Sequence, residues 1–240
     1  SPLSVAQFLP SDKMSFDVVV FDEASQICPE DAIGAIMRGK QIVVVGDNKQ
    51  MPPSRQFAAT VDDDTDDDTG VGMVESILDE CVSCGLAQRR LRWHYRSRFE
   101  ELILFSNNHF YDGALTTFPP PRDNDSSRWA VTWERVDGYY TPGGVRGGRE
   151  DAHTNRIEAD HVARLAIDHA RRRPYQSLGI ITFNEAQRRV IEERIQLLTG
   201  DDHTLLEFFA EGRANGFFVK ALENVQGDER DFILFSVGFG

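Results

Sequence analysis

The chain has 240 residues, of which 40% are hydrophobic and 27% are charged, and its formal net charge is −13. This composition fits a globular chain with a sizeable core and excludes a membrane span, because no run approaches the roughly 18 apolar residues that a span requires. The net charge argues against nucleic-acid binding, which usually needs a basic footprint. Six carboxylates lie in one block, however, between Asp62 and Asp68, and we expect this block to form a solvated loop.

Two short runs rich in β-branched residues predict buried parallel strands in the first part of the chain. Phe16–Phe21 is followed directly by Asp22 and Glu23, and Gln41–Asp47 ends in an acid as well. Between them, Pro29–Met37 has the start signal and the apolar spacing of a helix. A strand–helix–strand unit of this kind places its acids at the carboxyl edge of a parallel sheet, where α/β proteins bind their ligands.

The rest of the chain predicts further alternation of helices and strands. Helices are expected near Val74–Cys84 and at Phe99–Phe110, Asn155–Arg173 and Glu185–Leu198, and strands are expected at Trp129–Val136, Leu178–Phe183 and Phe232–Val237. This alternation indicates an α/β fold with parallel sheets. The basic run Arg171–Arg173 is interpreted as a helix C-terminus, where cations complement the helix dipole.

The three cysteines point to a reducing, cytoplasmic setting and to no metal site. Cys28, Cys81 and Cys84 are an odd number and have no histidine at zinc-binding spacing. Cys81 and Cys84 form a C-x-x-C string, but they lie in a stretch with helical spacing. We therefore interpret the pair as structural.

The residues after the first strand fit phosphoryl-transfer chemistry. Asp22 can hold Mg²⁺, directly or through water, while Glu23 can orient and activate an attacking water. After the second strand the chain leaves at Gly46, passes Asp47 and Gln50 and closes on two prolines that stiffen the loop. Each feature by itself is also compatible with an ordinary polar turn.

Taken together, these strings resemble a known family. Residues 18–26 (VVVFDEASQ) and 43–53 (VVVGDNKQMPP) resemble motifs II and III of the superfamily 1B helicases, the group of the nonsense-mediated-decay helicase and senataxin. Residues 91–97 resemble motif IV, 107–115 its Phe-Tyr-x-Gly-x-Leu continuation, 180–187 the following segment and 223–231 motif V. The order and spacing match over nearly the whole chain, and the flanking sequence is most similar to large bacterial helicase-like proteins of this group.

The resemblance implies RecA-like parallel sheets in two lobes: residues 1–85 as the C-terminal part of lobe 1, with the acidic loop at 60–72, and residues 86–240 as most of lobe 2. It implies ATP and Mg²⁺ as cofactors. By motif, Asp22 coordinates Mg²⁺ together with Glu23, which activates water, Gln50 senses the γ-phosphate, and Arg96 acts as an arginine finger.

The resemblance also assigns residues to the nucleotide and to the nucleic acid. Gln226, Gly227 and Glu229 would contact the nucleotide or link its site to the nucleic-acid track. Contacts with single-stranded DNA or RNA would involve Pro2, Ser4, Pro52, Thr182 and Phe183. Phe183 could stack on a base or cap its strand as a core aromatic, and both readings stay open.

The sequence contains no Gly-x-x-x-x-Gly-Lys-Ser/Thr string, which supplies the phosphate cradle of such motors. It also stops short of where the family places motif VI. We therefore expect a fragment of an ATP-driven helicase or translocase that needs the remaining segments of the parent chain for turnover. Two alternatives stay open: a non-catalytic binding module for nucleic acid or a protein, and a Mg²⁺-dependent phosphohydrolase or nuclease that uses Asp22, Glu23 and Asp47.

Overall fold

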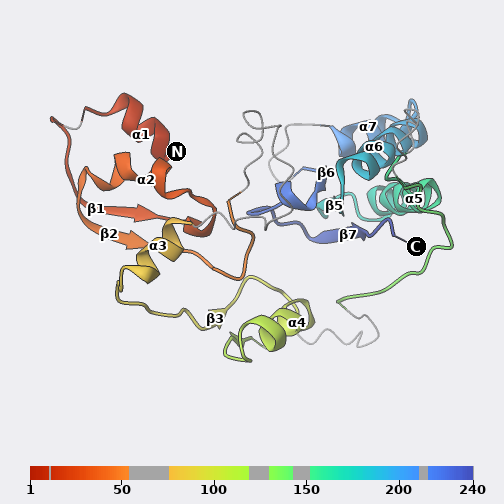
Figure 1. Ribbon diagram of the computed structural model, residues 1–240. Coiled ribbons are helices and arrows are strands. Elements are labelled where there is room, and N and C mark those ends of the chain that lie inside the picture. Colours follow the sequence, from red (N-terminus) through yellow and green to blue (C-terminus); the bar gives the residue numbers. More distant parts are fainter. Residues whose placement is uncertain (11, 54–75, 119–129, 143–151, 211–215, 240) are drawn as a thin grey trace. The chain divides into compact units, whose positions relative to one another are not determined.

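The computed structural model describes residues 1–10, 12–53, 76–118, 130–142, 152–210 and 216–239 (Figure 1). The chain divides into two compact units, Ser1–Thr132 (unit 1) and Trp133–Gly240 (unit 2), and each is described by itself. The acidic block between Asp62 and Asp68 lies outside the described residues. Within the described part of the chain, no helix is long and apolar enough to cross a membrane.

Unit 1 is built around a parallel pair of strands, β1 (Phe16–Phe21) and β2 (Gly39–Val44). The chain passes between them through a short 3₁₀ helix, η1 (Ala24–Gln26), and α2 (Pro29–Ile36). Proline at the first position of α2 and two acids in its first turn favour a helix start there. The strand–helix–strand unit expected from the sequence is therefore confirmed.

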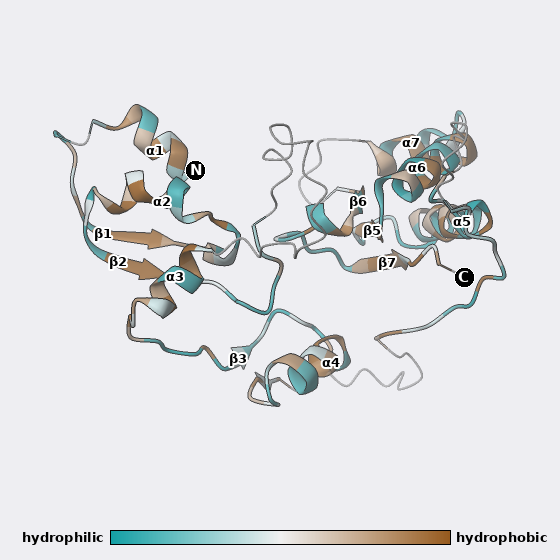
Figure 2. Cartoon of the chain, viewed as in Figure 1, coloured by the Kyte–Doolittle hydropathy of each residue, from teal (hydrophilic) through white to brown (hydrophobic). Residues whose placement is uncertain are grey.

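The core of unit 1 lies on one face of this strand pair. Val19 and Phe21 of β1 lie on this face together with Ile42 and Val44 of β2. These four side chains pack against α2 and α3 (Ile77–Ser83). The intervening residues Val18, Val20, Val43 and Val45 point to the opposite face and are exposed. Figure 2 shows both strands as hydrophobic segments. One apolar face of this sheet is thus covered by helices and the other is open to solvent.

The described residues of unit 1 form four further elements. They are α1 (Pro2–Phe8), β3 (Trp93–His94), α4 (Glu101–Phe110) and β4 (Thr116–Thr117). The strand β3 pairs with β4 in parallel, and the ring of Trp93 stacks on Phe118 at 5.5 Å. The helix α1 packs against α2, where the guanidinium of Arg38 donates hydrogen bonds to the carbonyl oxygens of Ala6 and Leu9.

Unit 2 has a three-stranded parallel sheet in the order β6 (Phe218–Ala221), β5 (Leu178–Thr182), β7 (Phe232–Ser236). Every residue of the central strand β5 is buried. The helices α5 (Arg156–Arg172), α6 (Glu185–Thr199) and α7 (His203–Phe209) lie beside this sheet in Figure 1, and a 3₁₀ turn, η2 (Leu222–Asn224), follows β6.

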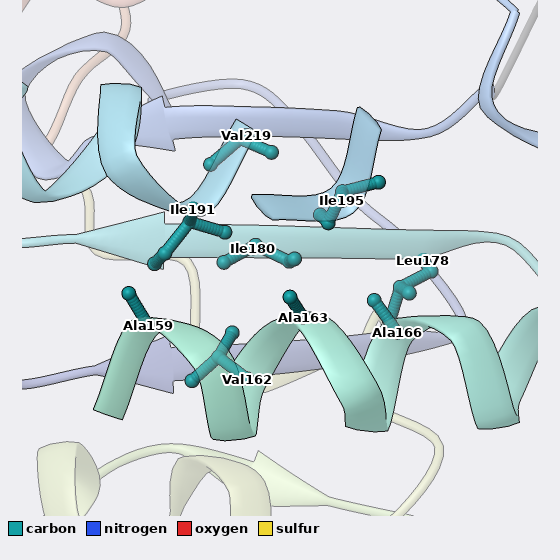
Figure 3. Packing of buried hydrophobic residues seen from close by; sticks show 9 residues of the cluster. All are labelled: Ala159, Val162, Ala163, Ala166, Leu178, Ile180, Ile191, Ile195 and Val219. Carbon is teal, nitrogen blue, oxygen red and sulfur yellow. The ribbon is translucent and has the colours of Figure 1, made fainter. Parts of the chain in front are cut away.

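The core of unit 2 lies where α5 and α6 meet β5. Figure 3 shows Ala159, Ala163 and Ala166 of α5 facing β5, with Ile180 between the two helices. Small alanine side chains let α5 approach the sheet closely, while Ile191 and Ile195 of α6 fill the remaining space. The basic residues at the end of α5 lie in its last turn, as the sequence indicates.

The structure confirms the α/β class with parallel sheets and most of the expected elements. The strand expected at Trp129–Val136 is wrong: no strand forms in its described part, 130–136. Oε1 of Glu134 there lies 3.0 Å from Nε2 of His161 of α5, and within the part of the chain that the structure describes this segment joins none of the sheets. The short elements α1, α7 and β6 were not expected.

Candidate functional site

The candidate site in unit 1 lies at the carboxyl edge of β1 and β2. The backbone N–H of Val45 donates to Phe21 O at 2.8 Å, and Ala24 N donates to Val45 O at 2.9 Å. The segments that follow β1 and β2 therefore stay hydrogen-bonded past the strand ends. This pairing holds Asp22 and Glu23 next to the loop that follows β2. A Cβ at Gly46 would lie 3.0 Å from Ser25 N, a tighter contact than most side chains make, so this close approach favours glycine.

Glu23 occupies an unusual backbone conformation. Its φ of 51° and ψ of 40° lie in the left-handed region, which costs a non-glycine residue roughly 1–2 kcal/mol. The backbone N–H of Glu23 donates to Asp22 Oδ1 at 3.0 Å, and both side chains are exposed. Strain of this kind gathers at functional sites, where the surrounding structure holds a side chain in one direction.

Asp47 organises the loop after β2. Its Oδ1 accepts from Lys49 N at 2.9 Å, and its Oδ2 accepts from the Gln50 amide Nε2 at 3.2 Å. The same Oδ2 accepts from the hydroxyl of Tyr111, 64 positions along the chain, at 2.5 Å. Farther along this loop Pro52 is exposed, whereas Pro53 is buried.

Tyr111 reaches Asp47 from the segment after α4. Burial, together with the hydrogen bond to the Asp47 carboxylate, raises the pKa of Tyr111 to about 12. The segment is held by the buried side chain of Asn107, which donates to Leu115 O at 3.1 Å and accepts from Leu115 N at 3.0 Å. Asp112 and Gly113 have positive φ and turn the chain between these contacts.

Arg96 lies in the turn after β3, in unit 1, with its side chain exposed. In the same turn, the ring of His94 and the Ser97 hydroxyl are 2.7 Å apart. Burial and the positive charge of Arg96 lower the pKa of His94. The lobe boundary expected between residues 85 and 86 stays a prediction, as does the role of Arg96.

In unit 2, Gln226, Gly227 and Glu229 lie in the turn that joins η2 to β7. Gly227 has a φ of 87°, which favours glycine in this turn. The neighbouring Asp228 carboxylate pairs with Lys220 Nζ of β6 at 2.5 Å and fixes the turn on the sheet.

The residues expected at the nucleic acid differ in exposure. Thr182 at the end of β5 is fully buried, and its hydroxyl donates to Asn184 O at 2.9 Å. Phe183 is exposed over 41% of its surface, and its ring lies 6.0 Å from that of Phe235. The ring of Phe183 is therefore accessible to solvent, whereas Thr182 holds the strand end. Pro2 and Ser4 lie in the first turn of α1, where Ser4 N donates to Ser1 Oγ at 3.3 Å.

Sequence reasoning missed a buried polar network at the ends of β5 and β7. The amide of Gln187 accepts from Asn155 N at 2.8 Å and donates to Asn155 O and to the Ser236 hydroxyl, each at 3.2 Å. The Ser236 hydroxyl donates in turn to Glu158 Oε1 at 2.8 Å, and Gly238 N donates to the same carboxylate. Asn155 and Gln187 each lie at the start of a helix, and this was the only feature of the local sequence that could have pointed to the network.

The side chains at the carboxyl edge of β1 and β2 suit a Mg²⁺ ion that takes some of its ligands from the protein and the others from a phosphate. Among the described residues, no group of three or more His, Cys, Asp or Glu side chains could hold a metal ion by itself. Mg²⁺ does not need such a cage, because it commonly binds one or two carboxylates and keeps waters or phosphate oxygens as its other ligands. The exposed Asp22 carboxylate fits that coordination.

Comparison with known proteins identifies the class of protein to which this chain belongs. A family model described as an AAA domain matches residues 73–238, and a second model with the same description matches residues 3–55. An uncharacterized ATP-dependent helicase of Mycoplasma pneumoniae is 34% identical over 98% of this chain. The ATP-dependent helicase NAM7 of Saccharomyces cerevisiae is 27% identical over 92%, and a regulator of nonsense transcripts 1 homolog of Drosophila melanogaster is 26% identical over 93%.

The chain therefore belongs to the AAA-domain family of superfamily 1B helicases. It spans about a fifth of the length of the relatives just named: 21%, 22% and 18%, respectively.

Proposed function

We propose that this chain is part of an ATP-dependent helicase or translocase that couples the hydrolysis of Mg²⁺-bound ATP to movement on single-stranded DNA or RNA. The observation that carries the proposal is the joint edge of β1 and β2, where Asp22 and Glu23 follow one strand and Asp47 with Gln50 follows its parallel neighbour. The names of the relatives, which describe ATP-dependent helicases, support it.

The proposed roles follow from the chemistry of these side chains. Mg²⁺, when bound, would neutralise charge on the transferred phosphoryl group. Asp22 would hold the metal, and Glu23, fixed by its left-handed backbone, would orient the attacking water and accept its proton. Gln50 would sense the γ-phosphate, and the exposed guanidinium of Arg96 would pair with phosphate oxygens as their charge develops.

The remaining residues are proposed to bind and to couple. Gln226, Gly227 and Glu229 would contact the nucleotide or link its site to the nucleic-acid track. Pro2, Ser4, Pro52 and Phe183 would lie along that track, and the buried Thr182 would act there through the strand end that it holds in place. Because the sequence contains no P-loop string, we propose that the chain alone hydrolyses ATP poorly or not at all.

The test compares ATP hydrolysis by this chain with hydrolysis by a longer protein that contains the chain and a P-loop. Each is assayed alone, with oligo(dT) and with oligo(U). We expect turnover only in the longer protein, stimulated by one or both polymers. Glu23→Gln should lower kcat roughly 10²- to 10⁴-fold. Arg96→Ala should lower it roughly 10³- to 10⁵-fold.

Two control variants separate these effects from general damage. Glu30→Gln removes an exposed acid from α2, and Arg89→Ala removes an exposed cation upstream of Arg96; neither should change kcat. A longer protein that binds polymer but never hydrolyses ATP would favour the binding-module alternative. Metal-dependent cleavage of nucleic acid by the chain alone, lost in Asp22→Ala, would favour the nuclease alternative.

A further inference from the structure

The contact between Tyr111 and Asp47 joins two segments that the family motifs treat separately. Tyr111 belongs to the segment after α4, and Asp47 belongs to the loop after β2. Both residues lie in unit 1. The hydroxyl of Tyr111 and the amide of Gln50 donate to the same carboxylate oxygen, Oδ2 of Asp47, at 2.5 and 3.2 Å. Tyr111 is thus one hydrogen-bonded side chain away from Gln50.

The chemistry of the three groups fixes which way the Gln50 amide faces. An ionised carboxylate only accepts hydrogen bonds, so Asp47 can hold Gln50 only through Nε2. The amide oxygen Oε1 of Gln50 is then directed away from Asp47. If Asp47 turned, the hydrogen bond that gives the amide this preference would be lost.

Asp47 is kept from turning by contacts on both of its oxygens. Lys49 N holds Oδ1 from within the loop, and Tyr111 holds Oδ2 from outside it. Tyr111 is itself placed by a rigid support, because Asn107 closes the segment 107–115 with two hydrogen bonds to Leu115. The raised pKa of Tyr111 keeps its hydroxyl protonated, and therefore donating, at all physiological pH values.

We propose that Tyr111 is a positioning residue for the reaction: through Asp47 it fixes the orientation of the Gln50 amide toward the γ-phosphate. The inference rests on the function proposed above and extends it to a residue for which the resemblance gives no role. Tyr111 touches neither substrate nor metal in this role, so its loss should slow the chemical step and leave ATP binding intact.

The test uses the longer protein with ATP, Mg²⁺ and a saturating oligonucleotide. Tyr111→Phe, which removes only the hydroxyl, should lower kcat roughly 10-fold while KM for ATP changes by less than about twofold. In a Gln50→Ala background the same substitution should cause no further loss, because the two residues act through one chain of contacts. Tyr140→Phe is the matched control, since it removes a hydroxyl that lies 3.0 Å from His153 Nδ1 in unit 2.

The outcomes separate this inference from the proposed function. If the unaltered protein does not hydrolyse ATP, both fail. Suppose instead that the unaltered protein hydrolyses ATP and that Gln50→Ala lowers kcat. The role of Tyr111 alone is then overturned if Tyr111→Phe keeps full kcat, or if adding Tyr111→Phe to Gln50→Ala lowers kcat further. Should Tyr111→Phe fail to fold, Asp47→Ala gives the same test, because it removes the acceptor that Tyr111 and Gln50 share, and its loss must likewise vanish in Gln50→Ala.

Discussion

The sheets of units 1 and 2 are both parallel, but they hold the residues at their edges in different ways. In unit 2 the central strand is fully buried, and its end is anchored by the polar network of Asn155, Gln187 and Ser236, each at most 1% exposed. In unit 1 one face of the sheet is open, and the Gln50 amide is held by an exposed hydrogen bond to Asp47. Surface contacts of this kind are individually weak, so the edge in unit 1 can rearrange at lower cost than the edge in unit 2.

The largest effect should come from the buried strand. Ile180→Ala should destabilise unit 2 by about 3 kcal/mol, because it leaves a cavity between α5 and α6, whereas Val20→Ala, at a side chain 62% exposed, should change unit 1 by less than about 0.5 kcal/mol. Both changes in stability can be measured by unfolding each variant in urea and monitoring the hydrogen exchange of peptides from each unit. Equal losses would mean that the open face of β1 is covered in solution.

A smaller loss is expected from the polar network. Gln187→Ala should cost about 2 kcal/mol in unit 2, because the backbone of Asn155 and the hydroxyl of Ser236 lose buried partners. Gln196→Ala, on the exposed side of the same helix, is the matched control and should be close to neutral. The same unfolding experiment measures the stability of both variants. If Gln187→Ala left the stability of unit 2 unchanged, water would replace the hydrogen bonds of the network.

The smallest effect concerns Tyr111 and depends on pH. Burial and the hydrogen bond to Asp47 raise the pKa of Tyr111 in the folded state from an ordinary value of 10 to about 12, so the protonated phenol stabilises unit 1 fully below pH 10 and this stabilisation is lost as the pH rises through 12. Tyr111→Phe should therefore be less stable than the unaltered chain by about 1 kcal/mol at pH 8, and the difference should shrink toward pH 12.

The control for this pH series is Tyr175→Phe, because the side chain of Tyr175 is 99% exposed. It should match the unaltered chain at both ends of the range. A constant difference between Tyr111→Phe and the unaltered chain from pH 8 to 12 would contradict a hydrogen bond that depends on the phenol proton.

Periodicity was enough to predict the long or strongly patterned elements. The expected strand at Phe16–Phe21 agrees at both ends, and the helix expected at Asn155–Arg173 is observed as Arg156–Arg172 with Asn155 as its N-cap. The weakly patterned elements were missed for a physical reason. β6 has only four residues, and it is a strand because β5 lies beside it, which no local pattern records.

The candidate site was predictable only as far as it is local in sequence. The acids after β1 and the loop after β2 could be located, since each follows a recognisable strand. The contact of Tyr111 with Asp47 spans 64 positions, and the bonds of Gln187 to Asn155 and Ser236 span 32 and 49. Such pairs are decided by the fold, so no local pattern distinguishes these tyrosine and glutamine side chains from others.

The open face of the sheet in unit 1 also governs how the protein behaves at high concentration. The valines exposed on β1 and β2 form an apolar strip that favours self-association, and the net charge of −13 opposes it by repulsion between molecules. Salt screens that repulsion, and acid removes it as the carboxylates become protonated. Light scattering should therefore rise with ionic strength and as the pH falls, and the colloidal stability of the chain should be best in dilute, low-salt buffer at neutral pH.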